Sequence, residues 1–470
     1  MALRFGTSGL RGLVAEMGDA VCEAHVRAFL AHLRGTGAEP REVLVGRDLR
    51  PSSPRIAAAC RRAIRAEGLV AVGCGVVPTP ALALEAGRRR AAAVMVTGSH
   101  IPFDRNGLKF YRPGGEEISK EDEAGILVAL GREGRGRSAR VRVDAGVGRR
   151  YVARSVAFFG AGCLGGMRVG LYEHSAAGRA HMRAALAGLG AEVVPLGRSD
   201  SFVPIDTEAI PPDQAARIRD WVAEHGLAAL VSTDGDGDRP LVADETGRVL
   251  RGDALGALAA RLLGADAVAA PLNASTALEA SGWFARVLRT RIGSPHVIEG
   301  MARLKREGAR LVSGYEANGG FLLGGTAVSP EGRRLAPLPT RDAMVPALAL
   351  LAAAAREGRT LSALAGDLPE RATDSGRLQE VDVAAAGRLL DGLAGSRAAA
   401  TALLSGLAEG ELTAVDTLDG VRMRLASGEI VHLRLSGNAP ELRCYGEAAT
   451  GERAAELVSG TIARVARMLV

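Results

Sequence analysis

The chain has 470 residues, of which 47% are hydrophobic and 24% are charged, a composition typical of a soluble globular protein. This length is too great for a single hydrophobic core and predicts three or four domains of roughly 100–150 residues each. The net charge of +6 comes from scattered basic residues without an aromatic stacking platform. That pattern argues against nucleic acid as a partner and favours a small anionic molecule.

The cysteine pattern and the lack of long apolar runs bear on cellular location. Five cysteines form no CxxC pair and no paired framework, which favours a reduced compartment. The N-terminal region lacks the apolar core of a signal peptide, and no run of about twenty apolar residues could span a membrane. We therefore expect a cytoplasmic protein with no membrane partner, present as a monomer or a homodimer.

Apolar strands and amphipathic helices alternate through the first part of the chain. We expect strands at 42–46, 69–73 and 92–96, with a helix over 53–67. This β-α-β order predicts a mostly parallel, doubly wound layer. The Gly/Arg-rich stretch 131–150 is typical of a mobile linker or a surface connection.

The same order repeats in the middle of the chain. Strands are expected at 167–172, 192–196, 227–231, 266–270 and 309–313, with helices over 181–189 and 343–355. Near the C-terminus, segments 418–425 and 430–435 alternate strictly between apolar and polar residues, which predicts an antiparallel hairpin with one wet face. The predicted fold class is α/β, with three related mixed α/β units and a smaller α+β unit. We expect their bounds at 1–147, 148–253, 254–368 and 369–470.

Three carboxylates follow the buried strand expected at 227–231. They belong to Asp234, Asp236 and Asp238, and the glycines between them let the backbone curl so that the carboxylates converge. Convergent carboxylate oxygens suit a small, hard cation such as Mg²⁺. An isolated Asp-Gly repeat also occurs as a solvated turn, and this alternative remains open.

A serine and a histidine follow the strand expected at 92–96. Ser99 and His100 lie at the carboxyl end of that strand, where open α/β sheets bind ligands. Adjacent Ser and His side chains rarely align for proton transfer, so the pair is weak evidence for catalysis. Lys109, one of only three lysines in the chain, lies close by. Unlike arginine, lysine can release its proton, and neighbouring cations could depress its pKa into a useful range.

Two further loops carry polar side chains after predicted strands. Glu316 and Asn318 could bind adjacent sugar hydroxyls, although Asn-Gly-Gly is also ordinary turn chemistry. Arg434 and Arg443 flank a Ser-Gly-Asn turn whose small residues expose backbone donors, which is a plausible cup for a phosphate. A solvated basic turn is the alternative for this last loop.

The order of these loops resembles that of the α-D-phosphohexomutases, the phosphomannomutase/phosphoglucomutase superfamily. The resemblance covers nearly the whole chain and rests on five motifs in order. These are the opening motif Phe5–Gly12, the phosphoserine loop Thr97–Pro102, the metal loop Asp234–Arg239, the sugar loop Glu316–Gly320 and the phosphate loop Arg434–Arg443. It implies a heart-shaped assembly of four domains around one cleft, with each domain supplying one loop.

The resemblance also implies a mechanism. A phosphoryl group on Ser99 would move to a hexose phosphate, through a hexose 1,6-bisphosphate that returns its other phosphate to Ser99. Mg²⁺ would be bound by Asp234, Asp236, Asp238 and a phosphoryl oxygen on Ser99. We expect Arg11 and Arg239 to add positive charge and Lys109 to transfer the hydroxyl proton, with His100 as the second candidate. Glu316 and Asn318 would bind sugar hydroxyls, and the non-reacting phosphate would be held by Arg434, Ser436, Gly437, Asn438 and Arg443.

Three motifs depart from the family pattern. Gly98 and Ile101 replace the usual alanine and asparagine of the phosphoserine loop, and Asn438 and Ala439 replace threonine and glutamate in the phosphate loop. In the sugar loop Tyr315, Asn318 and Gly320 replace glycine, serine and histidine. We expect His296 to compensate for the missing histidine.

The sugar loop resembles that of some bacterial phosphomannomutases, so mannose phosphate is the expected substrate. Glucose and glucosamine phosphates remain alternatives. A catalytically silent sugar-phosphate-binding protein is a further alternative, which the missing sugar-loop histidine favours weakly.

Overall fold

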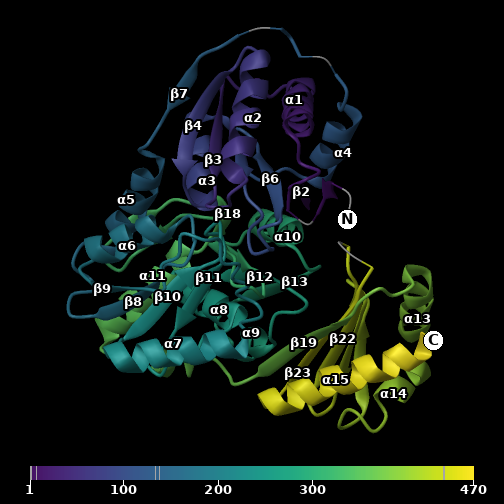
Figure 1. Ribbon diagram of the computed structural model, residues 1–470. Coiled ribbons are helices and arrows are strands. Elements are labelled where there is room, and N and C mark those ends of the chain that lie inside the picture. The colour runs from purple at the N-terminus through teal and green to yellow at the C-terminus, as the bar shows by residue number, and fades with distance from the viewer. Residues whose placement is uncertain (1–2, 7, 133, 137, 438–439, 470) are drawn as a thin grey trace.

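The computed structural model describes residues 3–6, 8–132, 134–136, 138–437 and 440–469. Its strands form four large sheets, and each sheet takes all of its strands from one of the four units expected from the sequence. The first unit lies at the top of Figure 1, the second and third lie below it, and the fourth lies to the lower right. The bounds between the units stay predictions.

The first sheet has seven strands in the order β1-β2-β6-β5-β3-β4-β7. Its centre is parallel and buried because βαβ crossovers cover both faces, whereas β6 returns antiparallel to β5. The strands are β1 (Arg4–Phe5), β2 (Leu10–Leu13), β3 (Glu42–Arg47), β4 (Val70–Val76), β5 (Ala92–Val96), β6 (Arg105–Tyr111) and β7 (Val141–Val143). The helices are α1 (Asp19–Gly35), α2 (Ser53–Ala66), α3 (Thr79–Arg89) and α4 (Lys120–Val128).

The Gly/Arg-rich stretch 131–150 is more ordered than a linker. Within the described part of this stretch, β7 pairs in parallel with β4 at the edge of the first sheet. Helix α5 (Val147–Phe159) then begins the second unit. Of the two expectations for this stretch, the mobile linker is therefore wrong for these residues, and the surface connection agrees with the exposed edge strand. The composition did not predict the strand, because Val141 and Val143 are exposed residues of an edge strand and lie among arginines in the sequence.

The second unit has four strands in the order β11-β10-β8-β9. Strand β10 is completely buried. Strand β11 pairs antiparallel with β10, and a short loop joins the two strands. The elements are β8 (Arg168–Tyr172), β9 (Glu192–Leu196), β10 (Ala229–Thr233), β11 (Pro240–Ala243), α6 (Arg179–Gly188) and α7 (Pro212–His225).

The third unit has five strands in the order β13-β12-β14-β15-β18 and a separate two-stranded ribbon. The strands are β12 (Ala267–Pro271), β13 (Arg286–Thr290), β14 (Val312–Tyr315), β15 (Phe321–Leu323), β16 (Ala327–Val328), β17 (Arg334–Leu335) and β18 (Leu338–Asp342). The helices are α8 (Gly252–Leu262), α9 (Ala277–Ala280), α10 (Ser294–Arg306), α11 (Met344–Glu357) and α12 (Leu361–Ala365).

The fourth unit is an antiparallel sheet in the order β19-β23-β22-β21-β20, packed against helices. The hairpin expected at 418–435 is confirmed as β21 paired with β22. The strands are β19 (Ala372–Leu378), β20 (Leu412–Asp416), β21 (Val421–Leu425), β22 (Ile430–Leu435) and β23 (Leu442–Ala448). The helices are α13 (Val383–Gly395), α14 (Arg397–Leu404) and α15 (Gly451–Met468).

The hydrophobic cores divide the molecule unequally. One continuous cluster of buried side chains joins the first three units, running from Leu44 through Val169 to Leu348. The fourth unit has a separate core that includes Leu404, Val431 and Val465. The fourth unit is therefore attached to the others by polar contacts rather than by a shared apolar core. No helix in the described ranges is long and apolar enough to cross a membrane.

Candidate active site

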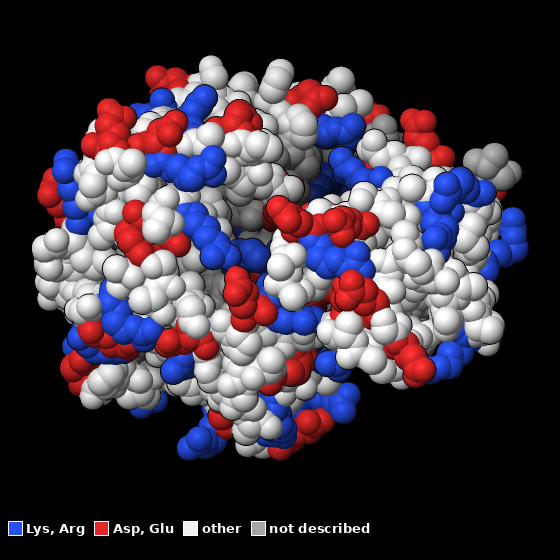
Figure 2. Space-filling model, turned by 90° about the horizontal axis from the view of Figure 1, so that it is seen from below, with Lys and Arg blue, Asp and Glu red and all other residues white. Residues whose placement is uncertain are grey.

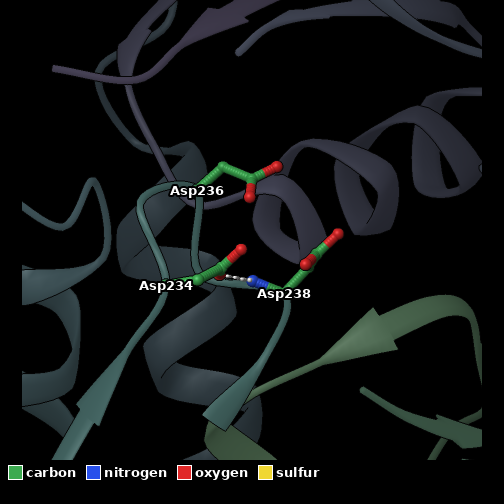
Figure 3. A group of neighbouring side chains, drawn as sticks. All are labelled: Asp234, Asp236 and Asp238. Atoms are coloured by element: carbon green, nitrogen blue, oxygen red, sulfur yellow. Dashed lines mark hydrogen bonds between the residues drawn. The ribbon is translucent and has the colours of Figure 1, made fainter. Parts of the chain in front are cut away.

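The three aspartates lie on one turn between β10 and β11. Strand pairing closes this turn, with Thr233 opposite Pro240, and Gly237 has a φ of +73° that favours glycine. Asp234, Asp236 and Asp238 are each completely buried, and their ligand atoms lie within 4.8 Å of one another. Figure 3 shows the three side chains on this turn and the hydrogen bond from the Asp238 amide to Asp234.

The unused oxygens of this group fit a cation. Oδ1 of Asp236 and Oδ1 of Asp238 are buried and have no hydrogen-bond partner, which is costly for a carboxylate unless a ligand binds there. Burial, and then the charges of Asp236 and Asp238, raise the pKa of Asp234 well above its usual value. A divalent cation would bind the unpaired carboxylate oxygens and offset the repulsion among the three carboxylates. The residues present therefore fit Mg²⁺, which prefers oxygen ligands.

Ser99 meets the aspartates from the other side of the site. Its hydroxyl donates a hydrogen bond of 2.6 Å to Asp234 Oδ2, and its Oγ lies 3.3 Å from Nδ1 of His100. Ser99 is buried with a φ of +53°, a conformation uncommon for a residue other than glycine. Such a backbone persists only where its surroundings impose it, and such positions cluster at functional sites.

Arg50, which was not predicted from the sequence, binds the backbone of this loop. Its guanidinium is buried and donates hydrogen bonds to the carbonyl oxygens of Ser99 at 2.9 Å and Pro102 at 2.6 Å. A Cβ on Gly98 would lie 2.7 Å from Cζ of Arg50. The glycine that departs from the family pattern therefore makes room for Arg50, and a glycine where the family has alanine was the available signal.

Lys109 lies between two of the aspartates. Its Nζ donates to Oδ2 of Asp236 at 2.7 Å and to Oδ2 of Asp238 at 2.6 Å. Burial opposes the charged form, but these two carboxylates outweigh burial and raise the pKa of Lys109. The expectation that neighbouring cations depress this pKa is wrong for this arrangement, because carboxylates are the nearer charges.

Positive charge gathers around His100. Burial, followed by the charges of Arg239 and Arg11, lowers the pKa of His100 far below its usual value. Burial, followed by Arg239, also lowers the pKa of Arg11. Nε of Arg239 lies 3.9 Å from Asp238 Oδ1. The structure thus places Arg11, Arg239 and His100 beside the Ser99–aspartate group, as a site for a phosphate requires.

The sugar loop turns sharply after β14. The Glu316 amide donates to the carbonyl of Gly320 at 3.1 Å, and Gly319 has a φ of +86°. Glu316 and Asn318 are both buried, and Asn318 accepts a hydrogen bond from the Gly320 amide at 3.0 Å. His296 is half-buried in the first turn of α10. Its expected compensation for the missing histidine stays a prediction.

A second arginine that the sequence analysis missed joins the sugar loop to the metal loop. Arg341, on β18, donates to Glu316 Oε2 and to Asp238 Oδ2, each at 2.7 Å. Its side chain is buried, and Ser294 Oγ lies 3.3 Å from its Nη1. Ser294, the first residue of α10, is thus hydrogen-bonded to this group.

The phosphate loop lies on the fourth unit. The pairing of β22 with β23 places Arg434 opposite Arg443, and two like charges in that relation are unfavourable without an anion. Arg434 pairs with Asp419 at 3.0 Å, and Arg443 pairs with Glu441 at 3.4 Å. The Ser436 amide donates to the Glu441 carbonyl at 2.9 Å, and space is open around Gly437. Asn438 lies outside the described residues.

A cavity of about 560 Å³ lies where the second, third and fourth units meet, a volume in the range of small-molecule sites. Its lining includes Thr207, Arg251 and Ala317 on one side, and His432 and Tyr445 on the other. Seen from below, the molecule is hollowed between its lobes, with basic side chains along part of the hollow (Figure 2). The cavity is adjacent to the sugar loop through Ala317, whereas Ser99 does not line it.

Comparison with known proteins agrees with this geometry. The family description "Phosphoglucomutase/phosphomannomutase, alpha/beta/alpha domain I" matches residues 2–135, and the description of domain III matches residues 251–372. A phosphomannomutase of Salmonella muenchen is 42% identical over 98% of this chain and 95% of its own length. A phosphoglucosamine mutase of Gluconacetobacter diazotrophicus is 33% identical over 76% of this chain and 79% of its own length.

The fold also matches a solved structure. A phosphoglucomutase/phosphomannomutase family protein from Burkholderia thailandensis superimposes with a TM-score of 0.74 at 22% identity. The match covers 98% of this chain and 97% of the other. At this identity the likeness shows the fold alone, and activity must be argued from the site.

Proposed function

This chain belongs to the phosphoglucomutase/phosphomannomutase family, and from that premise we propose that it moves a phosphoryl group between O1 and O6 of a hexose phosphate. Mannose phosphate is the proposed substrate, because the phosphomannomutase of Salmonella muenchen is similar over nearly the whole chain. The observation that carries the proposal is the hydrogen bond between Ser99 and Asp234, which joins the nucleophile to the carboxylate group.

The reaction begins with a phosphoryl group on Ser99 Oγ. The free hydroxyl of the bound hexose monophosphate attacks phosphorus, the new O–P bond forms, and the bond from phosphorus to Ser99 Oγ breaks. The resulting 1,6-bisphosphate turns over within the cleft, and its other phosphoryl group returns to Ser99 by the reverse chemistry. Because such transition states are loose, catalysis depends on positioning and on neutralising charge.

Charge is neutralised from several directions. Asp234, Asp236 and Asp238 would bind Mg²⁺, which supplies positive charge beside the phosphoryl oxygens. A phosphoryl dianion and a divalent cation carry charges of similar size and opposite sign. The site can therefore accept both with little change in net charge. Arg11 and Arg239 add positive charge on the same side.

The hydroxyl proton needs an acceptor, and we assign this role to His100, whose basicity would be restored when a phosphoryl dianion offsets the positive charge of Arg239 and Arg11 beside it. Its Nδ1 lies 3.3 Å from Ser99 Oγ, close to where the attacking hydroxyl must come. Lys109 instead keeps its proton between Asp236 and Asp238 and holds these carboxylates in place. Arg434 and Arg443 would hold the non-reacting phosphate, with Ser436 and Gly437 beside it. Glu316 and Asn318 would bind the sugar hydroxyls.

The test is a steady-state comparison of mannose, glucose, glucosamine and N-acetylglucosamine 1-phosphates with Mg²⁺ and a trace of the matching 1,6-bisphosphate. We expect the highest kcat/KM with mannose 1-phosphate. Parity with glucose 1-phosphate would replace the proposal by a dual-specificity mutase, and no turnover of any of the four would favour a silent binding protein.

The covalent step has its own test. Ser99→Ala should abolish turnover without changing the melting temperature by more than a few degrees, and Ser138→Ala, at an exposed position, should leave turnover unchanged. Labelling of wild-type protein, but not of Ser99→Ala, by a hexose 1,6-bisphosphate is also expected. Substantial turnover by Ser99→Ala would exclude the phosphoserine relay.

A further inference from the structure

Arg341 connects two loops that come from different units. Its two terminal nitrogens divide between Glu316 of the sugar loop and Asp238 of the metal loop, at 2.7 Å each. The side chain is only 3% exposed, and Ser8 Oγ lies 3.4 Å from its Nη2. An arginine buried in this way adds geometric specificity, because its planar fork fixes both carboxylates at once.

The position of the Arg341 side chain depends on the glycine at residue 320. A Cβ on Gly320 would lie 2.6 Å from Cδ and 3.0 Å from Cγ of Arg341. These atoms are the middle of a side chain whose end is already fixed by two ion pairs, so they cannot move away at low cost. Gly320 does not have a positive φ, so space rather than backbone freedom requires glycine here.

The position of Arg341 also decides which carboxylate oxygens remain for ligands. On Asp238 it takes Oδ2 together with Lys109, and Oδ1 is left without a hydrogen bond. On Glu316 it takes Oε2 and so fixes the carboxylate, whose other oxygen would then accept from the proposed sugar hydroxyl. One side chain therefore orients a proposed metal ligand and a proposed sugar ligand together.

We propose that Arg341 is a positioning residue for the hexose phosphate, which couples the sugar loop to the metal loop and takes the space that a side chain at position 320 would fill. Gly320 and Arg341 then act as a pair: the glycine serves to admit the arginine. This inference rests on the proposed function, because it names how Glu316 is oriented toward the sugar.

A purely structural ion pair makes different predictions from a positioning residue. If Arg341 only stabilised the fold, its loss would lower the melting temperature and leave the KM of the folded enzyme unchanged. If it orients Glu316, its loss raises KM for the sugar phosphate in the folded enzyme. A lysine at 341 keeps the charge and loses the fork, so it should restore stability better than it restores KM.

The experiment is a double-mutant cycle in the full-length protein with Mg²⁺ and hexose 1-phosphate. We expect Arg341→Ala and Gly320→Ala each to raise KM by about tenfold or more, whereas Gly320→Ala in the Arg341→Ala background should change KM by less than about twofold. Gly392→Ala, in α13 where an added Cβ meets nothing within 4 Å, is the matched control.

Each outcome decides the matter. Additive effects of the two substitutions, or an unchanged KM in Arg341→Ala and Arg341→Lys, would overturn the inference while the wild-type enzyme is active. Should Arg341→Ala fail to fold, Gly320→Ala and Arg341→Lys give the same KM comparison. Inactivity of the wild-type protein on every hexose 1-phosphate would instead refute the proposed function, so the two failures are distinguishable.

Discussion

The hydroxyl group of Ser99 donates a 2.6 Å hydrogen bond to Asp234, a residue 135 positions further along the chain. Phosphorylation of Ser99 would remove this donor and place a dianion beside a buried carboxylate. Two negative groups in a buried site repel strongly unless a cation lies between them. The relationship between these two residues therefore links the phosphorylation state of Ser99 to metal binding.

We expect phosphorylated protein to bind Mg²⁺ about tenfold more tightly than unphosphorylated protein, because a phosphoryl oxygen adds a hard ligand. Isothermal titration of Mg²⁺ into the two forms, separated by ion exchange, measures this difference. Ser99→Ala is the control and should match the unphosphorylated form. Equal affinities for all three proteins would contradict a metal site shared between Ser99 and the aspartates.

Gly98→Ala restores the residue that is usual in the family, yet we expect it to impair this protein. The added Cβ would meet the Arg50 guanidinium at 2.7 Å and displace the hydrogen bond from Arg50 to the Ser99 carbonyl. A loss of roughly 1–3 kcal/mol in unfolding free energy is typical of such overpacking. We also expect a lower kcat, because the Ser99 hydroxyl moves relative to Asp234.

The matched control for this substitution is Gly35→Ala at the end of α1, where an added Cβ meets nothing within 4 Å. Chemical denaturation and steady-state assays of both variants make the comparison. If Gly98→Ala kept wild-type turnover and stability, Arg50 would not be what holds the loop.

Three of the loops were predictable from the sequence because each follows a strand with a parallel neighbour, and the carboxyl ends of such strands place side chains at one edge of a sheet. The phosphate loop follows a strand of an antiparallel sheet, and its arginines and small turn residues were the signal there. Arg50 and Arg341 were not predictable in that way, because each contacts a loop far away in the sequence: Arg50 precedes Ser99 by 49 residues, and Arg341 follows Asp238 by 103. Periodicity carries no information about such pairs. The available signs of these two arginines were glycines at positions 98 and 320, where the family has larger residues.

His432 should make the fourth unit sensitive to acid. This side chain is buried in β22 and donates to the carbonyl of Asp419, and burial lowers its pKa to about 4. Unfolded histidine has a pKa near 6.5, so between these values the unfolded chain binds a proton that the folded state does not. Stability therefore falls as pH decreases from about 6.5 towards 4, by roughly 1.4 kcal/mol at pH 5.5.

The measurement is the melting temperature of wild-type protein and of His432→Gln at pH 7.5 and 5.5. We expect a smaller fall for His432→Gln, because glutamine can still donate to Asp419 but does not titrate. Part of the fall should persist, since His174 is also buried and its pKa is likewise lowered to about 4. Parallel curves for the two proteins would exclude His432 as a source of acid sensitivity.

Glu447 holds the fourth unit against the third. This buried carboxylate on β23 accepts a hydrogen bond from the Thr276 amide at 3.0 Å and pairs with Arg371 at 2.9 Å. The fourth unit has its own hydrophobic core, so polar contacts of this kind, together with the hydrogen bond from the Ile292 amide to Asp419, resist its separation. We expect Glu447→Ala to let the fourth unit move, which should raise KM for the hexose phosphate, since Arg434 and Arg443 lie on that unit.

Limited digestion with trypsin reports this movement directly, because Arg371 is itself a cleavage site at the junction before β19. Loss of Glu447 exposes this bond, so we expect cleavage after Arg371 to accelerate about tenfold, in proportion to the population of the open form. Glu452→Ala, at an exposed position in α15, is the control and should digest like wild type. Unchanged cleavage together with an unchanged KM would show that Glu447 does not govern how the fourth unit is held.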